Sequence, residues 1–186
     1  MDTQNKTSQQ WWQIIKETCL PIFLKKAKDY GTSWRILRMP SLTDQIFIKA
    51  TRIRSIQDKG AQRVHDAIDG EFIGIINYCV MALIQLSLPA DAPMELAPAE
   101  VEQLYMKLTS QTHDLLMNKN HDYGEAWRDM RITSFVDLIL MKLLRVKQIE
   151  DHQGTTIASE GVDANYQDMI NYSIFALIKM NEQQSN

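Results

Sequence analysis

The sequence predicts an all-α protein, a helical bundle of two fused three-helix repeats related by a pseudo-two-fold axis. Apolar residues recur at helical spacing along most of the chain, and no segment shows the alternating pattern of a strand. Proline, glycine and helix-capping residues separate these segments. The repeat is visible as the phrase Asp-Tyr-Gly-x-x-Trp-Arg, which occurs at 29–35 and again at 122–128.

The repeat continues beyond this phrase. Five polar residues of the first copy recur 93 positions later, and after one inserted residue Ile-Asn-Tyr at 76–78 recurs at 170–172. A period of half the chain is longer than the roughly 20–50 residues of solenoid units. We therefore expect a first helical repeat at 1–88, a linker rich in proline and alanine at 89–98, and a second repeat at 99–186, with both repeats sharing one core.

The first repeat should contain three helices. The first covers about 8–28 behind the capping-box pattern Thr7-x-x-Gln10, and Pro21 should kink or interrupt it because proline lacks the N–H. Gly31 would cap its end in a left-handed conformation. The second and third helices are expected at about 41–58 and 64–86.

The second repeat should contain helices at about 98–118, 134–151 and 159–182. The third helix of each repeat is apolar on nearly all sides, which is typical of a helix that lies between others. We therefore expect these two helices to form the centre of the bundle and to pack against each other. The long uncharged run at 72–88 is interpreted as part of this core and not as a membrane span.

Composition excludes several classes of function. The net charge of −3 gives no broad attraction to duplex nucleic acid or to an anionic membrane. Cys19 and Cys79 lack metal-ligand spacing and are interpreted as buried small hydrophobes of a cytoplasmic protein. The N-terminus has no apolar signal-peptide core. The four histidines lack zinc-site spacing, and no P-loop, dinucleotide-binding or hydrolase motif occurs.

Acids in the apolar third helices are the first candidates for chemistry. Asp168 lies in an uncharged stretch, so its carboxylate needs a cation, a metal or a cavity. In the first repeat the acid is one turn earlier, because Glu71 matches Asn165 and Gly74 matches Asp168. Such oxygens suit Mg²⁺, and an ion pair is an equally good interpretation. The candidate metal ligands are Glu71, Asp168, Asn165, Asp44 and Asp137.

Basic and aromatic residues are candidates for substrate binding. Two lysine–arginine pairs lie one turn apart on the second helices and could hold a phosphate or pair with the acids. The aromatic residues of the repeated phrase could stack on a base or fill the end of the bundle, and filling is favoured for the tryptophans. The candidate substrate-binding residues are Lys49, Arg52, Lys142, Arg145, Asp29, Tyr30, Trp34, Asp122, Tyr123 and Trp127.

The ordered motifs DYGxxWR, RxxSxxD, KxxR and an Asn-Tyr helix resemble the nucleotide modification associated domain 1 family over nearly the whole chain, as two copies. More distantly, the chain is similar to the all-α nucleoside triphosphate pyrophosphohydrolases of the MazG and dimeric dUTPase type. This resemblance implies helical bundles, often dimeric, that bind Mg²⁺ through ExxE and ExxD motifs. The chain departs from that pattern, since Asp44 and Asp137 are followed by cations where those enzymes carry further acids.

These observations lead to a hypothesis of a nucleotide-binding protein that takes a nucleotide or another phosphate-bearing small molecule. It would act with Mg²⁺, as a pyrophosphohydrolase in which Asp168 and Glu71 are catalytic and hold a metal that activates water. Two alternatives remain: a non-catalytic helical interaction module whose charges are internal ion pairs, and an accessory factor for modified nucleotides. A homodimer is a further assembly that we consider.

Overall fold

The computed structural model describes residues 3–60, 68–152 and 161–184. Regular structure in these ranges is entirely helical and includes no strand, which confirms the predicted all-α class. The elements are α1 Thr3–Gln13, the π-helical segment η1 Ile14–Cys19, α2 Leu20–Tyr30, the 3₁₀ turn η2 Ser33–Ile36, α3 Met39–Lys59, α4 Ile68–Ser87, α5 Pro98–Tyr123, the 3₁₀ turn η3 Ala126–Asp129, α6 Ile132–Asp151 and α7 Val162–Gln184.

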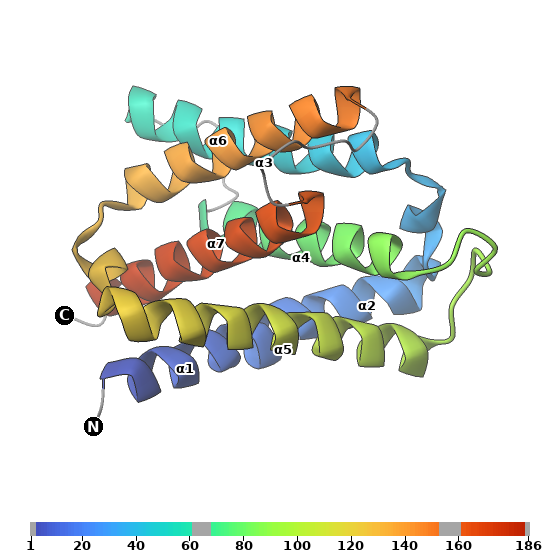
Figure 1. The fold of residues 1–186 in the computed structure, drawn as a ribbon, viewed down its shortest axis with the longest axis horizontal. Helices are drawn as coiled ribbons and strands as arrows, with labels where there is room; N and C mark the ends of the chain where they lie inside the picture. Colours follow the sequence, from blue (N-terminus) through green and yellow to red (C-terminus); the bar gives the residue numbers. More distant parts are fainter. Residues whose placement is uncertain (1–2, 61–67, 153–160, 185–186) are drawn as a thin grey trace.

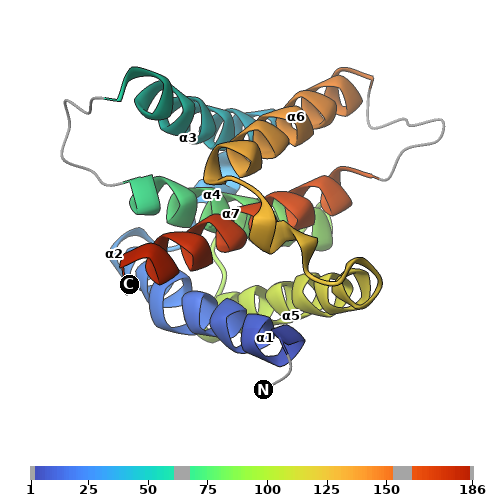
Figure 2. The same cartoon turned by 90° about the vertical axis from the view of Figure 1, so that its left-hand side faces the viewer.

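The helices form three layers (Figures 1 and 2). The central layer contains α4 and α7, which pack against each other. On one side α3 and α6 cross each other above them, and on the other side α5 and the rod formed by α1 and α2 lie below. The start of α1 and the end of α7 lie at the same end of the molecule (Figure 1). The prediction that the third helix of each repeat occupies the centre is therefore confirmed.

One continuous hydrophobic cluster fills the space between the layers. Fully buried residues such as Phe72 of α4 and Ile170 of α7 belong to it, together with Trp11 from the outer layer. Within the described ranges α4 alone is long and apolar enough to cross a membrane by composition, but 56% of the relevant window is buried against the other helices. The burial matches the predicted role as a core helix.

Both cysteines are buried and free, as the sequence predicts. Burial raises the pKa of the Cys19 thiol to about 12 and raises that of Cys79 as well. Neither side chain therefore provides a reactive thiolate at neutral pH.

The first helix differs from the prediction at its start. It begins at Thr3 instead of near Ser8, and Thr7 is fully buried inside it, where its hydroxyl donates to Glu125 at 2.8 Å. The supposed capping residue is thus used in a tertiary contact. Near Pro21, where the sequence predicts a kink or interruption, the π-helical segment η1 separates α1 from α2, and Pro21 lies in the first turn of α2, where its missing N–H removes no α-helical hydrogen bond.

Other helix ends also shift by a few residues. α3 begins at Met39 and not at Ser41, with Pro40 in its first turn, where a missing N–H removes no helical hydrogen bond. α6 begins at Ile132, two residues before the predicted start, and α5 continues to Tyr123. The predicted starts at 64 and 159 lie outside the described residues. Gly31 has the expected positive φ of 60°, although its ψ of −144° is not that of a left-handed helix.

Candidate functional site

The acid of the first repeat is held by two cations from α3. The Glu71 carboxylate accepts from Lys49 Nζ at 3.2 Å and, through its other oxygen, from Arg52 Nη1. The Glu71 side chain is 9% exposed, whereas those of Lys49 and Arg52 are 26% and 28% exposed. The sequence raised an ion pair as an equal alternative to a metal, and the geometry of Glu71 is that of an ion pair.

The acid of the second repeat is also paired, but with different cations. Asp168 accepts from Lys142 Nζ of α6 at 2.6 Å and from Lys119 Nζ of α5 at 3.2 Å. The Lys142 side chain is 9% exposed and that of Asp168 13%, so this pair is more buried than either pair of Glu71, whereas the Lys119 side chain is 41% exposed. Arg145 is exposed. Charge-assisted contacts of this kind satisfy a carboxylate that would otherwise be costly to bury.

The other two predicted acids, Asp44 and Asp137, lie away from these clusters and form contacts between α3 and α6. Asp44 of α3 accepts from Lys147 of α6 at 2.6 Å, and Asp137 of α6 faces Arg54 of α3 at 3.8 Å. The repeat aligns Asp44 with Asp137 and Arg54 with Lys147. The two pairs are therefore one contact made twice, in opposite directions.

The predicted acid ligands do not gather at one point. No three His, Cys, Asp or Glu side chains lie close enough to hold a metal ion in the ranges 3–60, 68–152 and 161–184. Asn165 donates to the carbonyl of Gly161 at 2.9 Å, and its own side-chain oxygen is buried without a partner. Glu71 and Asp168 each contact two cations, an arrangement that neutralises both acids without a metal ion, and the magnesium site stays a prediction.

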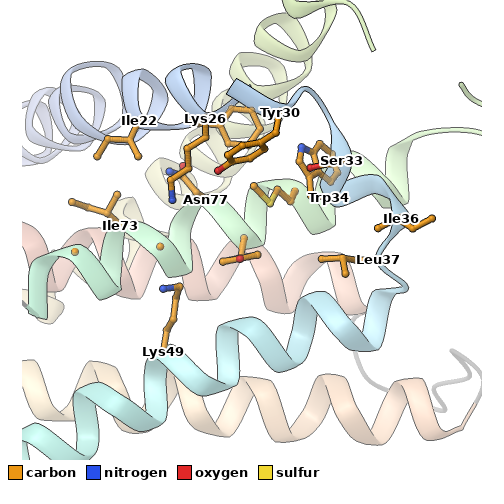
Figure 3. A pocket seen from close by; sticks show the side chains of 15 residues that line it. Ile22, Lys26, Tyr30, Ser33, Trp34, Ile36, Leu37, Lys49, Ile73 and Asn77 are labelled. Carbon is orange, nitrogen blue, oxygen red and sulfur yellow. The ribbon is translucent and has the colours of Figure 1, made fainter. Parts of the chain in front are cut away.

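A cavity of about 480 Å³ opens beside the first repeat and is called the first pocket (Figure 3). Lys26 projects into it from α2 and Lys49 from α3, toward α4 between them. Its aromatic lining comprises Tyr30, Trp34 and Tyr78. Further lining residues are apolar or neutral, and among the residues that the structure describes no acid lines it. The first pocket therefore combines two cations with a largely apolar and aromatic wall.

A cavity of about 690 Å³, the second pocket, lies at the matching place in the second repeat. Its lining includes Lys119 and two acids, Asp122 and Asp168. Six aligned pairs of positions line the two pockets: Phe23 and Leu116, Lys26 and Lys119, Gly74 and Asp168, Asn77 and Asn171, Tyr78 and Tyr172, Met81 and Phe175. The two pockets thus have a common framework and opposite charge.

The repeated phrase contributes to the pockets unequally. Trp34 and Trp127 are 8% and 6% exposed, in agreement with the favoured prediction that the tryptophans fill the bundle. Trp127 stacks on Phe175 with ring centroids 4.1 Å apart, whereas Trp34 lines the first pocket. Tyr30 is 55% exposed at the rim of the same pocket. The side chain of Tyr123 lies outside the described part of the structure.

The two aspartates of the phrase, Asp29 and Asp122, are exposed. Asp122 contacts its neighbour His121 at 3.3 Å and lines the second pocket. Asp29 lines neither pocket. Of the two aspartates, only Asp122 therefore lines one of the two cavities.

Sequence reasoning missed the lysines on the first helix of each repeat. Lys26 and Lys119 line the two pockets, and their recurrence 93 positions apart was a signal that could have identified them. Asn77 and Asn171, which recur in the Ile-Asn-Tyr phrase, serve to bind the lower layer: Tyr105 donates to Asn77 at 2.8 Å, and Trp11 donates to Asn171 at 3.1 Å.

Burial also affects the tyrosine of the second pocket. Burial and the nearby Asp168 raise the pKa of the Tyr172 hydroxyl, while Arg145 opposes that rise. The hydroxyl is therefore protonated at neutral pH and available as a hydrogen-bond donor.

A family model described as nucleotide modification associated domain 1 matches the chain twice, at residues 26–86 and 119–180. The two matches are consistent with a tandem duplication, and each contains the cations, acid and Asn-Tyr pair described above. No curated protein and no solved structure matches the chain significantly.

Proposed function

The chain belongs to the nucleotide modification associated domain 1 family, and on that premise we propose that it is a nucleotide-binding protein whose site is the first pocket. The observation that carries the proposal is the lining of this pocket, which places two lysines and three aromatic rings around a cavity of about 480 Å³. Ligand pockets of this size are mostly apolar with a few polar groups that orient the ligand.

The phosphate of the nucleotide would bind at the lysines. Lys26 makes no ion pair within the described ranges, so its ammonium group is available to an anion. Lys49 Nζ is 3.2 Å from Glu71, whose carboxylate is shared between Lys49 and Arg52. A phosphate would thus find cations on two sides without a metal ion.

The base would bind against the aromatic wall. Tyr30 is exposed by more than half at the rim and the buried Trp34 lines the same pocket, so a planar base would find two aromatic rings to contact. Ile22 and Ile36 are exposed apolar residues of the same lining. They would cover the apolar face of a base.

Hydrolysis is not part of the proposal. The predicted pyrophosphohydrolase activity and its Mg²⁺ remain predictions, because no observation of the described acids favours a metal site over the ion pairs. The alternative of an interaction module draws support from those same ion pairs. It differs from our proposal in predicting no affinity for any nucleotide.

We further propose that the two repeats are related by a pseudo-two-fold axis, each with one pocket, and that 1–88 and 99–186 arose as copies. Support comes from the contact that is made twice between α3 and α6, by Asp44 with Lys147 and by Asp137 with Arg54. Reciprocal contacts of this kind are typical of a two-fold interface. The six aligned pairs of pocket positions support the same arrangement.

The test is nucleotide binding by the variant Lys26→Ala, measured by isothermal titration over a panel of nucleoside mono- and triphosphates without added metal. We expect affinity to fall by about tenfold or more, because a hydrogen bond to a charged group contributes about 1.5–3 kcal/mol. The melting temperature should stay unchanged, since the Lys26 side chain is exposed.

Lys25→Ala is the matched control, because Lys25 is an exposed neighbour of equal charge that does not line the pocket. It should bind as the unaltered protein does. If the unaltered protein binds no nucleotide of the panel, or if both variants lose affinity equally, the proposal is wrong. Adding Mg²⁺ or Mn²⁺ and measuring pyrophosphate release in the same panel tests the separate prediction of hydrolysis.

A further inference from the structure

Among the six aligned pairs of lining positions, one pair differs in charge between the two pockets. Asp168 of the second pocket is replaced by Gly74 in the first. In the second repeat the Asp168 carboxylate lies between Lys142 at 2.6 Å and Lys119 at 3.2 Å. The aligned lysines of the first repeat, Lys49 and Lys26, line a pocket that reaches the backbone of Gly74.

Resting on the function proposed above, we infer that the Asp168 carboxylate occupies in the second pocket the position that the ligand's phosphate takes in the first. Asp168 thus acts as a built-in anion that closes the second pocket to phosphate. The chain consequently has one phosphate site, in the first repeat, although both repeats retain the pair of lysines.

Charge supports this assignment. Of the described residues, two lysines and no acid line the first pocket, whereas Lys119, Asp122 and Asp168 line the second. A phosphate would be attracted to the first lining and repelled by the second. Size does not explain the difference, because the second cavity is the larger, at about 690 Å³ against 480 Å³.

The contacts at Gly74 also support the assignment of the phosphate to the first pocket. A Cβ atom at Gly74 would lie 2.7 Å from Cε and 3.0 Å from Nζ of Lys49, so the lysine lies across the bare backbone. A carboxylate introduced there would meet the Lys49 ammonium directly, as Asp168 meets Lys142. The lysine end is flexible and can move to accept it.

The experiment exchanges the acid positions between the repeats without changing the net charge. Glu71→Asn with Gly74→Asp gives the first repeat the acid arrangement of the second, and Asn165→Glu with Asp168→Gly does the reverse. The number of sites is measured by equilibrium dialysis with the nucleotide that the unaltered protein binds most tightly. We expect one site in the unaltered protein, none in the first variant and two in the second.

A second measurement does not depend on any nucleotide. Inorganic phosphate should raise the melting temperature of Asp168→Asn by several degrees more than it raises that of the unaltered protein, because phosphate replaces the missing carboxylate between Lys119 and Lys142. Sodium chloride at equal ionic strength controls for screening. Asp44→Asn is the matched variant, since it breaks an ion pair of the same 2.6 Å length that lines neither pocket.

The possible results separate the two proposals. If the unaltered protein binds no nucleotide while phosphate selectively stabilises Asp168→Asn, the proposed function fails and the role of Asp168 stands. If phosphate stabilises Asp168→Asn and Asp44→Asn equally, or if the exchanged variants keep one site each in the original pocket, the inference is overturned. The Asp168→Asn measurement decides the inference even where an exchanged variant does not fold.

Discussion

The first pocket and the second pocket use the same two lysine positions in different ways. In the first, the acid at Glu71 pairs with Lys49 and Arg52 and leaves Lys26 open to the cavity. In the second, Asp168 draws both aligned lysines together. The acid of the second repeat lies one helical turn later than that of the first. We infer that this shift leaves the first pocket open to an anion, whereas the second pocket already contains the Asp168 carboxylate.

The two loops that contain the repeated phrase, at 29–35 and 122–128, also differ in the segments to which they are hydrogen-bonded. The first loop is tied to the connector that precedes α5, because Thr32 donates to Met94 at 2.8 Å and accepts from Leu96. The second is tied to α1, through Thr7 and Arg128 around Glu125. Segments outside the two family matches thus hold each loop in place, which leaves each repeat free to carry a different pocket.

The largest expected effect is on the stability contributed by the two acids. Asp168→Asn leaves the buried Lys142 without a counter-charge and should lower the free energy of unfolding by about 3 kcal/mol or more. Glu71→Gln should cost less, about 1–2 kcal/mol, because water reaches Lys49 and Arg52 more easily. Urea denaturation measures both values.

The double variant Lys142→Met with Asp168→Leu is the control for this comparison. Removing both charges should recover much of the loss, since apolar residues replace a buried pair at little cost. Equal losses for Asp168→Asn and Glu71→Gln would contradict the expectation that the more buried Lys142 depends more on its counter-charge than Lys49 and Arg52 do.

An intermediate effect is expected at the two glycines of the repeated phrase. Gly31→Ala should destabilise by about 3 kcal/mol, because its backbone at φ 60° and ψ −144° is nearly restricted to glycine. In addition, the new Cβ would lie 2.3 Å from Glu95 Oε1. Gly124→Ala should cost only about 1 kcal/mol, since φ 59° and ψ 30° is tolerated and no atom lies within 4 Å of the new Cβ. The measurement is thermal unfolding.

Adding Glu95→Ala to Gly31→Ala separates the two causes. It removes the clash together with the contacts from Glu95 to the Thr32 amide at 3.2 and 3.3 Å, and leaves the backbone strain. If the double variant is as stable as Glu95→Ala alone, strain at Gly31 contributes nothing and the comparison of the two loops is wrong.

Helices and core were predictable because their signals are local. The apolar faces of 64–86 and 159–182 identified the central layer without any knowledge of docking. Helix starts were less predictable, since Thr7 has the sequence pattern of a cap and is instead used by Glu125 from the other half of the chain. The Thr7 hydroxyl could bind a backbone N–H at a helix start or the Glu125 carboxylate, and only the tertiary fold decides which of the two it contacts.

The candidate site shows the same limit. The sequence pointed to Asp168, Glu71 and their partners on the second helices, and raised ion pairs as an alternative. It did not indicate Lys119, because that contact depends on how α5 docks against α7. The first pocket was likewise hidden, as its lysines come from α2 and α3 and meet only in the folded chain.

The smallest expected effect is at Glu150, whose aligned position in the first repeat is Gln57. Burial raises the pKa of the Glu150 carboxyl above its ordinary value, despite a hydrogen bond from Thr43 at 2.8 Å. An acid with a raised folded-state pKa becomes less favourable to stability as pH rises from its unfolded pKa of about 4.5 through the folded value.

Glu150→Gln keeps the acceptor oxygen for Thr43 and removes the charge. We expect it to raise the free energy of unfolding at pH 7 by about 0.5 kcal/mol and to have a smaller effect at pH 4. Thermal unfolding at both values checks this, and a variant that is less stable than the unaltered protein at pH 7 would show that the ionised carboxylate stabilises the contact between α3 and α6.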